Sequence, residues 1–140
     1  MRSKINESVL HFLYGYEITG VLADPDDFKL TMSMLLISKK NVSDARELSQ
    51  KILNKVSDLD EMIQKRSKEY EIDRISKVDL AILRWALYCR EESPEDAKTI
   101  LNEALRLSKK FSTIEASKYI HAVLDAGVSV EESYETCQAL

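Results

Sequence analysis

Glycine, proline and cysteine are all scarce in this chain of 140 residues. Three glycines and two prolines leave few points where turns can interrupt helices, so we expect long helices with short connections. The two cysteines, Cys89 and Cys137, have no metal-ligand spacing and are too few for a disulfide framework, which indicates reduced thiols. No secretory signal and no membrane-length apolar run is present, so the sequence predicts a cytoplasmic protein.

An excess of basic residues is also absent. The chain has 20 Lys and Arg against 24 Asp and Glu, a formal net charge of −4 and a pI near 5.3. Non-specific binding to nucleic acid depends on clustered Lys and Arg that neutralise phosphates. Any contact with RNA must therefore depend on a local group of basic residues and not on the charge of the whole protein.

The sequence contains no arrangement of residues that is typical of an enzyme. It has no glycine-rich phosphate loop, no HExxH motif and no serine elbow. Its carboxylates have the spacing of solvated helix faces. Neither His11 nor His121 has metal-ligand spacing with the other or with the cysteines. We therefore expect a protein that is not an enzyme, without a metal site and without a cofactor.

Apolar residues follow a helical period along the chain, and no alternating β pattern competes with it. We therefore predict one all-α domain over residues 1–140, a compact bundle of about seven helices. The expected helices and their starting signals are residues 4–18 ending at Gly20, residues 28–37 after Asp24-Pro25, one or two helices after Ser43 with a second start at Ser57, the segment from Ser76 to Tyr88, a helix after Ser93-Pro94, a helix capped by Ser112, and a short one after Ser129.

The helix from Val78 to Tyr88 is apolar around almost its whole circumference. Asp79 and Arg84 carry its only charges, and such a helix belongs in the middle of a bundle. A buried Arg84 needs an acidic or carbonyl partner. Glu103, on the following helix, is the partner that we predict, and we interpret the two residues as a structural pair.

The stretch from Arg74 to Asp125 contains an ordered series of motifs. It reads RISKVDLAILRWALYCREESPEDAKTILNEALRLSKKFSTIEASKYIHAVLD. An Arg-Ile-x-x-Val-Asp motif precedes Ile-Leu-Arg, a proline-led helix carries Asn-Glu-Ala, and a phenylalanine turn precedes Val-Leu-Asp. This series closely resembles the C-terminal half of the NusB family of transcription antitermination factors. A weaker, ungapped similarity covers residues 2–18.

The resemblance implies an adaptor without enzymatic activity. NusB-type proteins pair with NusE, a small-subunit ribosomal protein, and the pair binds a short single-stranded RNA element called boxA. They thereby help RNA polymerase to read through terminators, notably in ribosomal RNA operons. We therefore expect boxA-type RNA, NusE and the RNA polymerase antitermination complex as partners. Some NusB-type proteins self-associate, so a homodimer of the free protein remains an alternative.

One part of the family's RNA face is an arginine-rich N-terminal segment. Arg2 and Lys4 fall on its basic positions, and Tyr14 matches the tyrosine that closes the motif. Ser3 and Asn6 stand where the family usually has basic residues, and His11 replaces a usual glutamine. The resemblance therefore implies an RNA contact here with fewer phosphate contacts than is typical of the family.

The other part of that face lies at the start of the family's sixth helix. Phe111, Lys118 and Tyr119 match its aromatic and basic residues, and Glu115 stands where the family often has aspartate. Aromatic faces stack on single-stranded bases, and lysines hold phosphates. Packing within the core is the alternative for the aromatic residues, including Tyr14. A capping box with Ser112 is the alternative for Glu115, whose role toward a partner we treat as secondary.

Two other functions remain open. One is a protein-only scaffold on the same fold, with weakened or lost RNA binding. The acidic pI favours it, and so does the N-terminal segment, which has fewer basic residues than is usual in the family. The RNA-binding domain that precedes the methyl-transfer domain in some ribosomal RNA methyltransferases is disfavoured, because we expect no such domain after residue 140.

Overall fold

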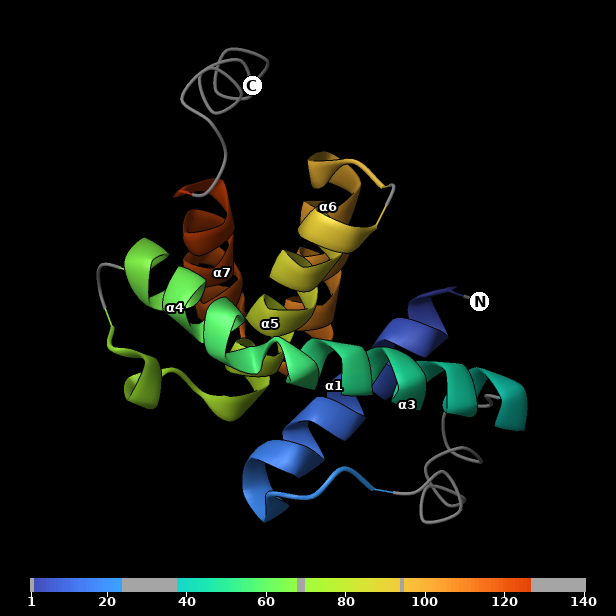
Figure 1. Cartoon of the computed structure of the whole chain (residues 1–140). Coiled ribbons are helices and arrows are strands. Elements are labelled where there is room, and N and C mark those ends of the chain that lie inside the picture. Colours follow the sequence, from blue (N-terminus) through green and yellow to red (C-terminus); the bar gives the residue numbers. More distant parts are fainter. Residues whose placement is uncertain (1, 24–37, 68–69, 94, 127–140) are drawn as a thin grey trace. The chain divides into compact units, whose positions relative to one another are not determined.

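The computed structural model describes residues 2–23, 38–67, 70–93 and 95–126, and these form helices and short connections without a strand (Figure 1). Six α-helices and one 3₁₀ turn are described, which confirms the all-α prediction. The helices expected over residues 28–37 and after Ser129 lie outside the described residues. The chain forms two compact units, Met1–Ser57 and Asp58–Leu140, and each is described by itself. The single domain stays a prediction.

The first unit consists mainly of α1 (Arg2–Thr19) and α3 (Lys39–Asn54), which pack against each other. α1 ends at Gly20 as predicted: its φ of +79° is in the left-handed region that glycine adopts freely, and its N–H donates to the Tyr16 carbonyl at 2.7 Å. α3 begins earlier than predicted, because Ser38 and not Ser43 caps it by accepting from the Asn41 N–H at 3.2 Å.

α4 (Val56–Arg66) is separate from α3. Lys55 leaves the helical conformation, with φ −111° and ψ 15°, and its N–H donates to the Ile52 carbonyl at 3.0 Å. This is the tightened bond that closes the end of many helices. The open alternative of one kinked helix or two is thus resolved in favour of two.

The second unit contains most of α4, a 3₁₀ turn η2 (Ile72–Arg74), α5 (Lys77–Glu92), α6 (Ala97–Phe111) and α7 (Ile114–Ala126). α5, α6 and α7 all pack against one another (Figure 1). α5 is buried continuously from Asp79 to Leu87, as predicted for the central helix. The predicted cap is also confirmed, since the Ser76 hydroxyl accepts from the Asp79 N–H at 3.2 Å.

The starts of α6 and α7 differ from the prediction. Asp96 caps α6, accepting from the Thr99 N–H at 2.7 Å, three residues after the predicted start at Ser93. This bond is the main reason why the pKa of Asp96 lies below its usual value. Thr113 caps α7, accepting from the Ala116 N–H at 2.9 Å. Ser112 instead ends α6, so the predicted capping box with Glu115 is wrong.

Arg84 is buried and has an acidic partner, as predicted. Two hydrogen bonds join its guanidinium to the carboxylate of Asp60 on α4. Glu103 forms a salt bridge with Arg106 on its own helix. The need for an acidic partner was correctly inferred from burial, and the pairing of Arg84 with Glu103 stays a prediction.

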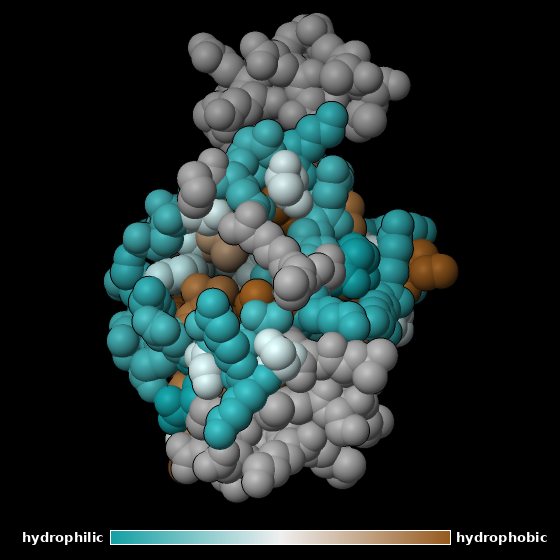
Figure 2. All heavy atoms as spheres, turned by 90° about the vertical axis from the view of Figure 1, so that its right-hand side faces the viewer, coloured by the Kyte–Doolittle hydropathy of each residue, from teal (hydrophilic) through white to brown (hydrophobic). Residues whose placement is uncertain are grey.

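Hydrophilic side chains cover most of the described surface in the face drawn in Figure 2. In the face drawn in Figure 2, hydrophobic side chains appear only in small areas between hydrophilic ones. None of the described helices has the length and apolar character needed to cross a bilayer. The large hydrophobic side chains that remain exposed on described residues are Tyr14, Ile18, Val21, Tyr70 and Ile114.

Candidate nucleic-acid interface

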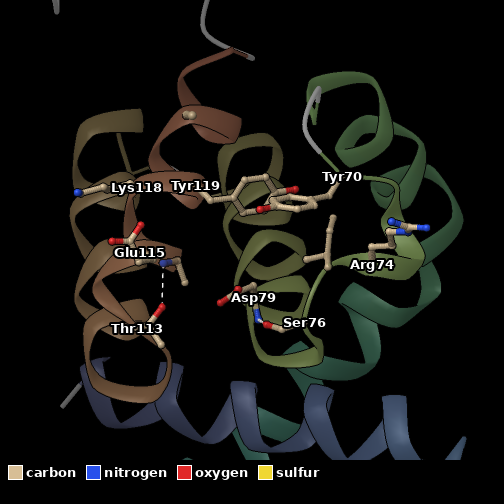
Figure 3. A pocket seen from close by; sticks show the side chains of 11 residues that line it. Tyr70, Arg74, Ser76, Asp79, Thr113, Glu115, Lys118 and Tyr119 are labelled. Carbon is tan, nitrogen blue, oxygen red and sulfur yellow. Dashed lines mark hydrogen bonds between the residues drawn. The ribbon is translucent and has the colours of Figure 1, made fainter.

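A pocket of about 550 Å³ opens in the second unit beside the first half of α7. Its other walls come from the connection after α4, from η2 and from the first turn of α5 (Figure 3). The pocket combines two aromatic rings with charges of both signs. The residues that supply these groups are Tyr70, Arg74, Asp79, Glu115, Lys118 and Tyr119.

Tyr119 is held firmly in one wall of the pocket. Its hydroxyl and that of Ser67, the residue after α4, lie 2.7 Å apart and share a hydrogen bond. Its ring packs edge-on against Tyr70, with centroids 5.3 Å apart and planes at 76° (Figure 3). Edge-to-face packing is a favoured arrangement of aromatic pairs. Tyr119 is half-buried, so both predicted roles, packing and contact with a ligand, are compatible with its position.

The charged groups of the pocket differ in their exposure. Arg74, Glu115 and Lys118 are exposed to solvent. Asp79 is 8% exposed, and its Oδ1 has no hydrogen-bond partner among the described residues. Figure 3 shows its carboxylate directed toward the pocket. A buried acceptor without a partner is unfavourable, so this oxygen can readily accept a hydrogen bond from a group that enters the pocket.

The predicted site residue Phe111 lies outside this set. It is the last residue of α6, it is half-buried, and the ammonium group of Lys110 lies 5.6 Å from the centre of its ring. That distance is typical of a cation–π contact. The buried hydroxyls of Ser108 on α6 and Ser117 on α7 lie 2.8 Å apart, and their hydrogen bond links the two helices.

The three N-terminal site residues belong to the first unit and lie on α1. The side chain of Arg2 is outside the described residues, and Lys4 is half-buried. Tyr14 is 40% exposed, whereas its neighbour Leu13 is 1% exposed. The tyrosine therefore leaves part of its ring accessible for stacking, while the adjacent face of the helix forms the core.

Sequence reasoning missed three members of the pocket. Tyr70 was not singled out from the sequence, and Arg74 and Asp79 were not expected to line a binding site. Arg74 and Asp79 both belong to the Arg-Ile-Ser-Lys-Val-Asp sequence, in which Arg74 precedes a buried isoleucine and Asp79 follows it in the first turn of a helix. That motif was the available signal, but its position opposite α7 depends on tertiary structure.

The described residues were compared with the clusters of side chains that hold metal ions in proteins. Within residues 2–23, 38–67, 70–93 and 95–126, no group of three or more His, Cys, Asp or Glu is placed to hold a metal ion. His121 instead lies 3.6 Å from Asp125 on the same helix, Nε2 to Oδ2.

Comparison with known proteins identifies the family. The model of the NusB family matches residues 3–128. A protein of Campylobacter curvus named transcription antitermination protein NusB is 33% identical over 125 residues, covering 89% of this chain and 94% of that protein. Its counterpart in Campylobacter concisus is 31% identical over 124 residues, covering 89% and 93%.

A solved structure shows the same fold. NusB of T. maritima matches with a TM-score of 0.73 at 22% identity, covering 96% of this chain and 97% of that chain. The described helices, the motif series from Arg74 to Asp125 and the family match over residues 3–128 lead to one conclusion. The chain belongs to the NusB family.

Proposed function

We propose that this protein is a transcription antitermination adaptor that binds boxA-type single-stranded RNA together with the ribosomal protein NusE. In this role it joins the RNA polymerase antitermination complex and supports the transcription of ribosomal RNA. The family match over residues 3–128 carries the proposal. Relatives that bear the name transcription antitermination protein NusB match it over nine-tenths of their length.

The proposed RNA face combines cations with aromatic rings. Arg2, Lys4 and Lys118 bind phosphates, and Tyr14, Phe111 and Tyr119 stack on bases. Exposure supports this assignment for Lys118 and Tyr14, because both reach solvent. Single-stranded RNA is bound in general by such combinations of basic and stacking side chains. Glu115, exposed beside Lys118 on α7, is proposed to face a partner.

NusE is expected to be necessary for strong binding. The chain has a net charge of −4, and phosphate neutralisation supplies most of the non-specific affinity for nucleic acid. The protein alone should therefore bind boxA-type RNA weakly. A partner that adds surface and pre-organises the face should raise the affinity several-fold, a coupling of about 1–3 kcal/mol.

Fluorescence anisotropy with a labelled boxA-type RNA tests the proposal. The RNA is titrated with the protein alone, with NusE alone and with both, and a scrambled RNA serves as the control. Tighter binding by the pair than by either protein, with preference for boxA, supports the adaptor. No preference by the pair would contradict it.

A protein-only scaffold is the second candidate, and the acidic net charge favours it. The scaffold predicts that the protein and NusE form a complex whose affinity for RNA equals that of NusE alone. Size-exclusion chromatography of the two proteins, combined with the anisotropy titration, separates these functions. A complex without added RNA affinity would establish the scaffold.

A further inference from the structure

Ser67 connects two aromatic residues of the pocket through its single hydroxyl group. It donates to the backbone carbonyl of Tyr70 at 2.7 Å, and it lies 2.7 Å from the Tyr119 hydroxyl. A serine hydroxyl has one proton to donate and two lone pairs that accept. Because that proton is used on Tyr70, the phenol of Tyr119 must donate to Ser67. The three residues therefore form a directed chain, Tyr119 to Ser67 to Tyr70.

These hydrogen bonds hold the rings of Tyr70 and Tyr119 nearly at a right angle, and we call this ring pair the corner. Tyr119 approaches from α7, and Tyr70 from the connection after α4, with centroids 5.3 Å apart and planes at 76° (Figure 3). Ser67 is 7% exposed, whereas Tyr70 is 48% exposed. The hydrogen bonds are thus shielded from water while one ring of the corner remains open to it.

The surroundings of the corner suit a nucleotide. Arg74 and Lys118 line the same pocket and provide positive charge for a phosphate. The carboxylate of Asp79 faces the pocket, and its Oδ1, which has no hydrogen-bond partner among the described residues, can accept from an amino or imino group on the edge of a base. Two rings at nearly a right angle let a base stack on one face while its edge meets the other ring.

From this arrangement we propose that Tyr70 and Tyr119 together form the platform for one base of the bound single-stranded RNA, and that Ser67 is the positioning residue of this platform. The inference rests on the proposed function and deepens it, because it adds Tyr70 to the RNA face and identifies Ser67 as the residue that positions the platform. Ser67 does not touch the RNA; it fixes the ring of Tyr119 through the phenol and the backbone of Tyr70 through the carbonyl.

Four variants test the platform: Tyr70→Leu, Ser67→Ala, Tyr119→Phe, and Ser67→Ala combined with Tyr119→Phe. Each is titrated with labelled boxA-type RNA in the presence of NusE, at a temperature where circular dichroism shows all to be folded. Tyr70→Leu should weaken RNA binding on the order of tenfold, the effect of losing one stacked base. Tyr119→Phe keeps the stacking ring but loses the hydrogen bond to Ser67, so it should weaken RNA binding several-fold, less than Tyr70→Leu does.

The double variant isolates the role of Ser67. Ser67→Ala alone leaves the Tyr119 phenol without its acceptor and should weaken RNA binding several-fold, on the order of one hydrogen bond. This loss should shrink at least about threefold in the Tyr119→Phe background, where the bond between Ser67 and the phenol is already absent. A role confined to folding stability would lower the melting temperature without this coupling in RNA affinity.

Ile114→Ala is the matched control, because Ile114 is 71% exposed on the same helix and does not line the pocket. Tyr70→Leu and Ser67→Ala that bind RNA like the folded parent would overturn the platform and leave the proposed function standing. The platform is also overturned if Tyr70→Leu weakens NusE binding in the absence of RNA, since the corner would then be a protein interface. A parent that binds no RNA with NusE would overturn both proposals.

Discussion

The guanidinium of Arg84 and the carboxylate of Asp60 form a two-pronged ion pair that joins α5 to α4. Nε lies 2.8 Å from Oδ1, and Nη2 lies 2.9 Å from Oδ2. The side chain of Arg84 is 6% exposed and that of Asp60 is 30% exposed. The arginine is thus withdrawn from water, and its charge is balanced from the neighbouring helix in the geometry that guanidinium and carboxylate favour.

Replacing Asp60 should therefore destabilise the protein strongly. Asp60→Ala leaves the buried guanidinium of Arg84 without this carboxylate, and we expect the free energy of unfolding to fall by about 3 kcal/mol, measured by urea denaturation. Glu47→Ala is the control, because the Glu47–Lys51 pair on α3 is long at 3.9 Å and highly exposed. It should cost less than about 0.5 kcal/mol. Equal effects of the two substitutions would show that the Asp60 pair contributes little.

Trp85 tests the position of the central helix. It is 3% exposed, so Trp85→Ala removes a large buried ring and leaves a cavity. The expected loss is about 3–5 kcal/mol in the free energy of unfolding, followed by circular dichroism because Trp85 is the only tryptophan. Ile114→Ala, at a residue that is 71% exposed, should change stability by less than about 0.5 kcal/mol. A loss below about 1 kcal/mol for Trp85→Ala would contradict its burial in the core.

The cap of α7 provides a test that distinguishes two adjacent residues. Thr113→Ala removes the oxygen that accepts from the Ala116 N–H at 2.9 Å and should lower stability by about 1 kcal/mol. Ser112→Ala should have a smaller effect, because the hydroxyl of Ser112 does not cap this helix. Thermal melts of the two variants side by side provide the comparison. A larger loss for Ser112→Ala would restore the capping box predicted from the sequence.

His11 should make stability depend on pH in the mildly acidic range. Burial lowers its pKa below 6.5, and the charge of Glu7 opposes this shift with a smaller effect. Because the folded-state pKa is the lower one, the unfolded chain takes up a proton more readily. The stability that neutral His11 contributes is therefore present above the unfolded pKa and is lost as pH falls through the folded pKa.

The variant His11→Gln cannot take up this proton. Between about pH 7.5 and about pH 5, it should lose less stability than the parent protein when urea midpoints are compared. His121 is present in both proteins, so the difference between them isolates His11. Parallel pH dependence of the two proteins would show that His11 is not more easily protonated on unfolding.

Local signals in the sequence predicted the fold well where one residue decides the outcome. Gly20 ends α1 and Ser76 starts α5 as expected, because a left-handed C-cap and a serine N-cap depend only on their immediate neighbours. Local signals failed where several candidates stood together. Ser112 and Thr113 are both good caps, and only the path of the chain between α6 and α7 selects Thr113.

For contacts between residues far apart in the sequence, the type of partner could be predicted but not which residue supplies it. Burial of Arg84 required an acidic partner, but nothing in the sequence pointed to Asp60, which lies 24 residues away on α4. The same limit applies to the candidate site. The motifs suggested Lys118 and Tyr119 as site residues. Ser67 and Tyr70 are recognised as their neighbours only from the structure, in which both contact Tyr119 of α7. Ser67 lies 52 residues from Tyr119, and no periodic pattern connects them.

RNA binding by two α7 variants across a salt series tests the central claim most directly. In the presence of NusE, Lys118→Ala should weaken binding to boxA-type and scrambled RNA alike and lower the salt slope by about 0.7, as expected for one lost phosphate contact. Tyr119→Leu should cost about 1–3 kcal/mol of binding with little change in slope, because stacking releases no counterions. If both folded variants bind RNA like the parent while NusE binding persists, the RNA face is wrong and the protein acts as a scaffold.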